Sequence, residues 1–133
     1  MSNITITNND LGSPILEEAD FRDEILTVAS AATIKAGTIL ARDSSTGKMV
    51  PFVKGGSTNG NGVPKSIITY EVTTSSAMDV AIRCAVEGDY RLERLVIDAD
   101  GDASNIDGVV VDELRAYGLT PIDVTELNIY DNQ

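Results

Sequence analysis

The chain of 133 residues contains no histidine and no tryptophan, and Cys84 is its one cysteine. The absence of histidine removes the commonest general base, the Ser–His and Cys–His pairs of hydrolases, and most zinc sites. A single cysteine excludes an intramolecular disulfide. Carboxylate or lysine chemistry is still allowed, but no motif of either kind stands out. We therefore expect no catalytic residues, no metal site and no cofactor.

Basic residues are also scarce. Ten Lys and Arg stand against 21 Asp and Glu, which gives a formal net charge of −11 and a pI near 4.2. Phosphate contacts need clustered Lys and Arg, so the balance argues against nucleic acid and against anionic membrane surfaces as partners. An apolar run long enough for a membrane span is missing, and the N-terminus lacks the basic and apolar regions of a signal peptide. These features suit a protein made inside a bacterial cytoplasm.

Aromatic residues make up 5% of the chain and hydrophobic residues 42%. This composition predicts a modest, mostly aliphatic core, and the length predicts one domain. We place a flexible N-terminal arm at residues 1–18 and a single β-rich domain at residues 19–133.

The arm is polar and acidic, and no Lys or Arg precedes Arg22. The segments Asn8–Asp10 and Gly12–Pro14 would interrupt any regular element. Two interpretations are compatible: a segment without fixed structure in the free protein, and an extended strand once a partner offers a sheet edge. The apolar residues that would make the contact are Ile4, Ile6, Leu11, Ile15 and Leu16.

A β-hairpin is predicted between residues 38 and 53. Asp43–Gly47 has turn chemistry, because Asp and Ser side chains bond their own backbone and Gly47 allows a positive φ. Alternation in the first strand puts Ile39 and Ala41 on one face and Leu40 on the other. In the second strand, Pro51 removes a ladder donor, which indicates a sheet edge or the end of the pairing.

The clearest period-two pattern covers residues 78–86 and places Cys84 in its apolar row, where we expect it to be buried and inert. Further strands are predicted at Phe21–Val28 and Lys65–Val72, with a helical turn or loop at 29–32 and a polar turn at 73–76. The glycine-rich stretch at 55–62 lacks the ending of a phosphate-binding loop and reads as a surface loop.

Three aspartates at alternate positions, Asp98, Asp100 and Asp102, suggest a calcium loop. The sixth position of such a loop would be Ala103 instead of glycine, and the twelfth would be Val109 instead of glutamate. The sharp turn and the bidentate ligand are therefore misplaced or missing. A solvated loop that leads into a helix explains the segment, and we expect no metal there.

The one predicted helix follows this loop, with Ser104 or Asn105 as its cap and Asp107 in its first turn. Gly118 stands where a left-handed C-cap belongs, and Pro121 would stop the helix. Beyond it, residues 122–129 are spaced like one last strand or two short ones. The apolar stripe of the helix consists of Ile106, Val110, Leu114 and Tyr117.

Several short motifs, in this order, resemble the lambda-like head decoration proteins of tailed bacteriophages. The likeness extends over residues 15–120, and its weight comes from the order of the motifs, since each alone is weak. The segments that carry it are Ala19–Leu26, Ala36–Asp43, Thr46–Phe52 and Gly62–Ile68.

The resemblance implies a fold that is mainly β with one C-terminal helix (α+β), a small β-barrel or β-clip-like domain with a flexible N-terminal arm. It implies a homotrimer that binds the major capsid protein outside an expanded head, at local three-fold positions, and holds the shell against packaged DNA. The arm would add a strand to the capsid. The family carries no catalytic residues. Candidates for the trimer contact are the apolar row at 78–86 and the helix stripe, although both are equally explained as core.

Two rival functions remain open. Ala36–Leu40 also resembles the opening of small β-clip domains found in sugar-acid dehydratases and sialic-acid-type proteins, so an enzyme or carbohydrate-binding module is an alternative. Such a module would show a concave pocket with converging polar groups. The other rival is a phage tail or baseplate protein, which would share the acidic, β-rich character.

Overall fold

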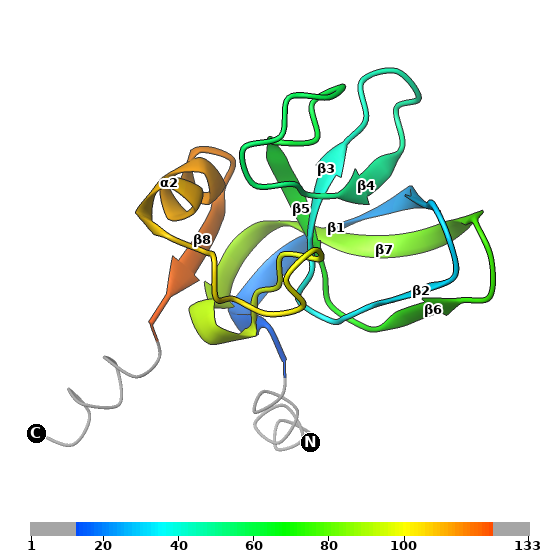
Figure 1. Cartoon of the computed structure of the whole chain (residues 1–133). Coiled ribbons are helices and arrows are strands. Elements are labelled where there is room, and N and C mark those ends of the chain that lie inside the picture. Colours follow the sequence, from blue (N-terminus) through cyan, green and yellow to red (C-terminus); the bar gives the residue numbers. More distant parts are fainter. Residues whose placement is uncertain (1–12, 124–133) are drawn as a thin grey trace, which may run out of the picture.

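The computed structural model describes residues 13–123 of the chain. Strands dominate this part, and α2 (Gly108–Ala116) is the one α-helix in it (Figure 1). A short 3-10 helix, η1 (Leu92–Arg94), directly follows a strand that ends at Arg91. The strands are β1 (Ile15–Val28), β2 (Ala32–Ile34), β3 (Ile39–Arg42), β4 (Met49–Pro51), β5 (Pro64–Ile68), β6 (Val72–Thr74), β7 (Met78–Arg91) and β8 (Leu119–Ile122).

Five strands close into a small barrel in the order β1-β4-β3-β5-β7, because β1 pairs with both β4 and β7. The pairing of β1 with β7 is antiparallel and runs almost the whole length of both strands. Strand β8 lies outside the barrel, parallel to the end of β7, and β2 pairs with β6 in a separate two-stranded sheet. A mainly β fold with a small barrel and one C-terminal helix is thereby confirmed.

The predicted hairpin is formed by β3 and β4. Its turn is held by Asp43, whose Oδ1 accepts hydrogen bonds from the N–H and the hydroxyl of Ser45 at 2.8 and 2.7 Å. Gly47 has a φ of +76°, as the turn requires. Pro51 pairs with Leu40 and is the last residue of β4, so its missing donor falls at the end of the ladder.

The alternation of β3 divides the interior into two clusters. Ile39 and Ala41 point into the larger cluster, which α2 covers with Val110 and Leu114, and Leu40 points into the smaller one. Both are mainly aliphatic, as the composition predicts. The larger cluster contains Ile39, Ala41, Phe52, Ile67, Ala85, Tyr90, Leu95, Ile97, Val110, Leu114 and Leu119. The smaller contains Leu26, Val28, Ile34, Leu40, Met49, Ile68, Val72, Ile82 and Cys84.

The helix begins later than predicted. Asp107, and neither Ser104 nor Asn105, is its N-cap, and its Oδ1 accepts a hydrogen bond from the N–H of Val110 at 3.1 Å. Ile106 therefore precedes the helix, although it still packs against the core. At the other end, Gly118 has the predicted positive φ, +82°.

Several strand boundaries differ from the predictions. Strand β1 begins at Ile15 instead of Phe21. Strand β7 contains the predicted segment at 78–86 and extends to Arg91. The strand predicted at 65–72 is split into β5 and β6, so Thr73 and Thr74 form strand instead of turn. The short strand β2 was not predicted, because three residues carry too little periodicity.

The last described strand, β8, follows the helix directly. Pro121 was expected as a helix stop; the helix ends before it, at Ala116, and Pro121 itself lies inside β8, opposite Tyr90. A proline is accepted here because β8 is an edge strand, whose outward side needs no donor. The expected strand residues Val124, Leu127 and Ile129 lie outside the described part of the chain.

Candidate interaction surfaces

Of the five residues predicted for the arm contact, Ile4, Ile6 and Leu11 lie outside the described residues, and for Leu16 only its place in β1 is described. Ile15 is half-buried, packs against the larger core cluster and stands opposite Tyr90 in the β1–β7 ladder. The structure therefore places one of the five, at the point where the chain enters the barrel.

The entry point is held by short polar contacts. The backbone N–H of Arg91 donates to the carbonyl of Pro14 at 2.8 Å, and the N–H of Ile15 donates to the Ser13 hydroxyl at 3.1 Å. Arg91 also stands opposite Ile122 in the β7–β8 ladder. The first and last described segments thus flank the end of β7, and both lie at the lower end of the molecule in Figure 1.

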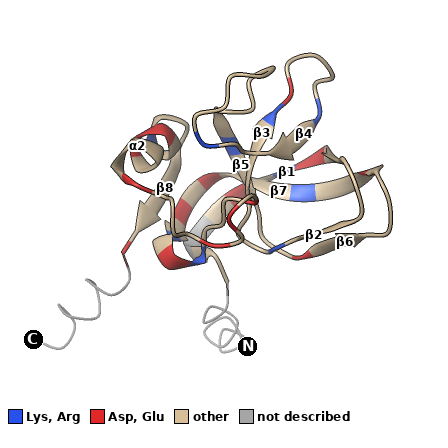
Figure 2. Ribbon diagram, viewed as in Figure 1, with Lys and Arg blue, Asp and Glu red and all other residues tan. Residues whose placement is uncertain are grey.

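Acidic residues gather along β1 and β7 near this end (Figure 2). Asp20 stands directly opposite Glu87, and the hydrogen bond between the two carboxyl groups, together with their repulsion, raises the pKa of Glu87. Like charges opposite each other destabilise an antiparallel pair. The sequence shows both acids, but only the register brings them together.

Near the other end of β1 and β7, Arg42 and Lys48 form ion pairs with acidic side chains of these two strands. Arg42 makes two hydrogen bonds to the carboxylate of Glu24, at 2.8 and 3.1 Å, and the first of these contacts lowers the pKa of Glu24. Lys48 binds Asp79 at 2.6 Å. Local charge is therefore balanced here, in contrast to the Asp20–Glu87 region.

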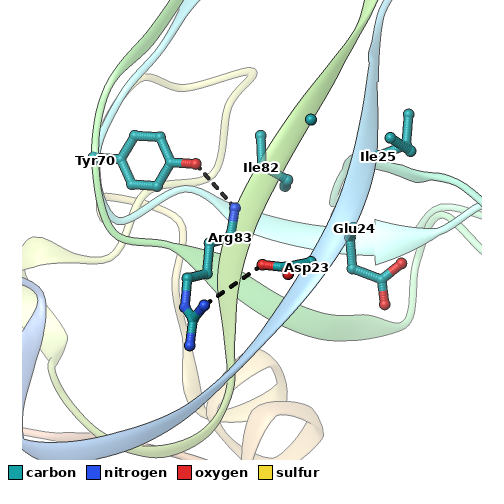
Figure 3. Close-up of a pocket in the computed structure, with 7 residues that line it drawn as sticks. Asp23, Glu24, Ile25, Tyr70, Ile82 and Arg83 are labelled. Atoms are coloured by element: carbon teal, nitrogen blue, oxygen red, sulfur yellow. Dashed lines mark hydrogen bonds and ion pairs between the residues drawn. The ribbon is translucent and has the colours of Figure 1, made fainter.

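A shallow hollow of about 580 Å³ lies on the outer face of β1 and β7, beside Tyr70 (Figure 3). The Tyr70 hydroxyl accepts a hydrogen bond at 2.9 Å from the N–H of Arg83, whose guanidinium lies 3.7 Å from Asp23. Ile25 supplies an exposed apolar wall. The sequence does not predict this hollow, because its residues come from three separate segments.

The hollow is a poor match to the rival carbohydrate module. Asp23 and Arg83 pair with each other, and Glu24 pairs with Arg42 of β3. These charged groups therefore do not converge on a point where a ligand could bind. A second hollow, of about 300 Å³, lies between Pro14, η1 and the loop at Gly101 and Asp102, next to the chain entry.

Cys84 is fully buried in the smaller core cluster, as predicted. Its thiol lies 3.8 Å from the carbonyl of Arg22, and burial raises its pKa. In the same predicted row, Ile82 is buried but Met78 is exposed. The thiol is therefore protonated near neutral pH and out of reach of reagents.

The three aspartates of the suggested calcium loop have different surroundings. Burial raises the pKa of Asp98, whereas a hydrogen bond from Ser104 lowers the pKa of Asp102. Within residues 13–123, no three Asp, Glu, Cys or His side chains are grouped closely enough to hold a metal ion.

The two segments considered for a trimer contact are mostly core. Val110 and Leu114 of the helix are fully buried, whereas Tyr117 and Val109 are exposed. None of the helices in the described region is long and apolar enough to span a membrane.

A comparison with models of protein families identifies the family of this chain. A family model for the bacteriophage lambda head decoration protein D matches residues 4–119, which is most of the chain and includes most of the arm. A search of curated proteins finds no match. The order of motifs from residue 19 onwards, the small barrel and the single C-terminal helix agree with this match. The chain belongs to the family of the bacteriophage lambda head decoration protein D.

Proposed function

We propose that the protein assembles as a homotrimer on the outside of an expanded phage head, at its local three-fold positions, and stabilises the shell against the pressure of packaged DNA. Family membership makes it a phage capsid decoration protein, a structural protein of the virion. The trimer, its position and its stabilising effect are the proposal, as is synthesis in the host cytoplasm.

The observation that carries the proposal is the family match, which includes the arm residues Ile4, Ile6 and Leu11. These three would contact the major capsid protein as part of an added strand. The neighbouring Ile15 and Leu16 lie in β1, and Ile15 packs against the barrel, so we assign them to the base of the arm.

Avidity explains why such a protein would act as a trimer. One short arm buries little surface and binds weakly. Three arms on one rigid body raise the effective concentration of the second and third contacts, which gains roughly 10²–10⁴ in affinity. A net charge of −11 discourages clustering of the protein away from the shell.

Two measurements test the proposal. Light scattering on the purified full-length protein gives its native mass, and co-sedimentation with expanded and unexpanded phage shells gives its binding. We expect trimers on expanded shells only, whether or not the trimer forms before binding. Shells decorated with the protein should also resist heat or chelation better than bare shells.

Other outcomes would contradict the proposal. A monomer that ignores both kinds of shell would favour the pocket-bearing module and a screen of sugar acids. Binding to tails or baseplates instead of heads would favour the other rival. Equal binding to expanded and unexpanded shells would remove the dependence on expansion.

A further inference from the structure

The glycine-rich loop between β4 and β5 contains the two Asn-Gly pairs of the chain, Asn59–Gly60 and Asn61–Gly62. Such a pair is open to deamidation, because glycine has no Cβ to hinder the approach of its backbone nitrogen to the preceding side chain. The two pairs have the same chemistry and stand two residues apart. Their surroundings differ, however, so the tertiary structure decides which of them reacts.

Asn59 lies at the tip of a tight turn. The N–H of Asn61 donates to the carbonyl of Thr58 at 3.0 Å, and the two residues between them, Asn59 and Gly60, have φ of +49° and +81°. Positive φ at both central positions is the pattern of a type I′ turn. Asn59 is exposed, and it is the one residue other than glycine with a positive φ in the described part of the chain.

The groups that would react in this pair are not held by the protein. In the described part of the chain, the hydrogen bonds of the turn use neither the N–H of Gly60 nor the side chain of Asn59. One contact restrains the backbone, because the carbonyl of Asn59 accepts a hydrogen bond from the N–H of Ser44 at 2.9 Å. This bond joins two surface loops, so it can open without disturbing the core.

The second pair is fixed in place. Asn61 is half-buried, its Oδ1 accepts a hydrogen bond from the N–H of Thr58 at 3.2 Å, and its carbonyl accepts one from the N–H of Val53 at 2.8 Å. Gly62 is buried, and an added Cβ there would collide with the carbonyl oxygen of Gly56. The side chain and the attacking nitrogen of this pair are therefore both held by their contacts.

We propose that Asn59 is a site of spontaneous deamidation in the folded protein and that Asn61 is protected. The backbone nitrogen of Gly60 attacks Cγ of Asn59, and its proton leaves with Nδ2 as ammonia, which closes a succinimide ring. Water then adds to either ring carbonyl and opens the ring to aspartate or isoaspartate. Water is the co-reactant, nothing is oxidised or reduced, and each event adds one negative charge to a chain of net charge −11.

The isoaspartate product would alter the contact between the two loops, which lie near each other at the top of Figure 1. Its main chain runs through Cβ and Cγ, so the backbone at residue 59 is one atom longer and the carbonyl that Ser44 binds is displaced. The aspartate product leaves the backbone unchanged. This inference is independent of capsid decoration, because neither the chemistry nor its test involves a shell.

The test incubates the full-length protein at pH 8 and 37 °C and follows both pairs in one tryptic peptide, residues 55–65. Mass spectrometry detects the change from amide to acid, and fragmentation assigns it to residue 59 or 61. A sample digested without incubation gives the baseline. We expect Asn59 to react about tenfold faster than Asn61, because the second pair must also break a side-chain hydrogen bond and move a buried backbone.

A synthetic peptide of residues 55–65 is the control for local sequence, and both asparagines should react in it at similar rates. Asn59→Gln and Asn61→Gln form a matched pair of variants, since glutamine must close a larger ring and reacts far more slowly. Isoelectric focusing of the aged protein should show the main acidic species in the wild type and in Asn61→Gln, and its loss in Asn59→Gln. Melting temperatures establish that both variants are folded.

Hydrogen exchange at the Ser44 amide should be faster in aged wild-type protein than in aged Asn59→Gln. Equal rates at the two asparagines in the folded protein would mean that the reaction passes through the unfolded state, and would overturn the inference. Faster reaction at Asn61, or an unchanged Asn59 after the synthetic peptide has fully reacted, would do the same. An undiminished acidic species in Asn59→Gln would place the reaction at another residue.

Discussion

The backbone N–H of Arg91 donates to the carbonyl of Pro14 at 2.8 Å, which ties the start of β1 to the end of β7. Arg91 also stands opposite Ile122 in β8. The two ends of the described chain therefore leave the barrel on opposite sides of one residue. A partner that meets this end of the molecule meets both.

Deletion of residues 1–12 should leave the melting temperature within about 2 °C of the wild type, because it keeps Ile15 and the whole of β1. Deletion of residues 1–18 also removes Ile15, which pairs with Tyr90 of β7 and whose side chain packs on the core. We expect a clear fall in melting temperature, measured by calorimetry. Equal stability of the two deletions would contradict the placement of Ile15.

The Glu24→Gln substitution should lower the free energy of unfolding by about 1 kcal/mol at pH 7, the upper end for an ion pair with one partly exposed member. The pair with Arg42 lowers the pKa of Glu24, so its stabilisation is present above the ordinary value of 4.5 and is lost as pH falls through the lower, folded value. Denaturation at several pH values measures this. Loss of stability on acidification should therefore be smaller in the variant.

A matched control is available in the same strand. Asp23 faces Arg83 at 3.7 Å, with side chains 83% and 67% exposed. The Asp23→Asn substitution should change the free energy of unfolding by less than about 0.3 kcal/mol. A similar loss in both variants would mean that charge alone, and not the geometry of the Glu24–Arg42 pair, is responsible.

Gly37 should tolerate no side chain. Its φ is +94°, and an added Cβ would lie 2.0 Å from the carbonyl oxygen of Arg94, a backbone atom. Gly47 has a φ of +76° but open space around its Cβ position. Gly47→Ala should therefore cost about 1 kcal/mol from backbone strain, and Gly37→Ala about 3 kcal/mol or more. Urea denaturation measures the free energy of unfolding of both variants. Equal losses would mean that backbone strain alone is responsible, and that the contact with the Arg94 carbonyl oxygen adds nothing.

The Cys84 thiol should react with a disulfide reagent only through unfolding, because its side chain is fully buried and its pKa is raised. The folded state holds this proton more tightly than the unfolded state, so the free energy of unfolding should fall as pH rises above about 9. Reagent kinetics in buffer and in denaturant measure the first effect. Fast reaction of the native protein at pH 8 would contradict the burial.

Calcium should leave the melting temperature unchanged. Asp98 and Asp102 have unlike surroundings, and Asp102 already accepts a hydrogen bond at 2.9 Å from the N–H of Ser104. Thermal unfolding with and without 1 mM calcium is the measurement. A rise of several degrees, abolished by Asp100→Asn, would establish a site in this loop.

Features that depend on neighbouring residues in the chain could be predicted from the sequence. The Asp43–Gly47 turn and the glycine at position 118 were predicted correctly, because short-range hydrogen bonds and a positive φ decide them. The predicted N-cap of the helix, Ser104 or Asn105, was wrong, and the N-cap is Asp107. Ser104, Asn105 and Asp107 are all suitable caps, and the contact of Lys54 with Asp107 at 2.8 Å, between segments far apart in the chain, favours the last.

The candidate surfaces were less predictable than the fold. The composition and spacing of residues 1–18 indicated an arm, and that interpretation stays a prediction for Ile4, Ile6 and Leu11. The opposition of Asp20 and Glu87 and the hollow beside Tyr70 were not foreseen, because each depends on residues brought together from distant segments.

The sequence by itself determined the β-rich character, the hairpin, the aliphatic core with a buried Cys84 and the absence of histidine chemistry. These follow from composition, alternation and local turn preferences. Tertiary structure alone decided which strands close the barrel, why Pro121 is accepted in β8, and which residues stand opposite each other across β1 and β7. Such features depend on register and on contacts between residues far apart in the chain, and a one-residue change in register moves every side chain to the other face.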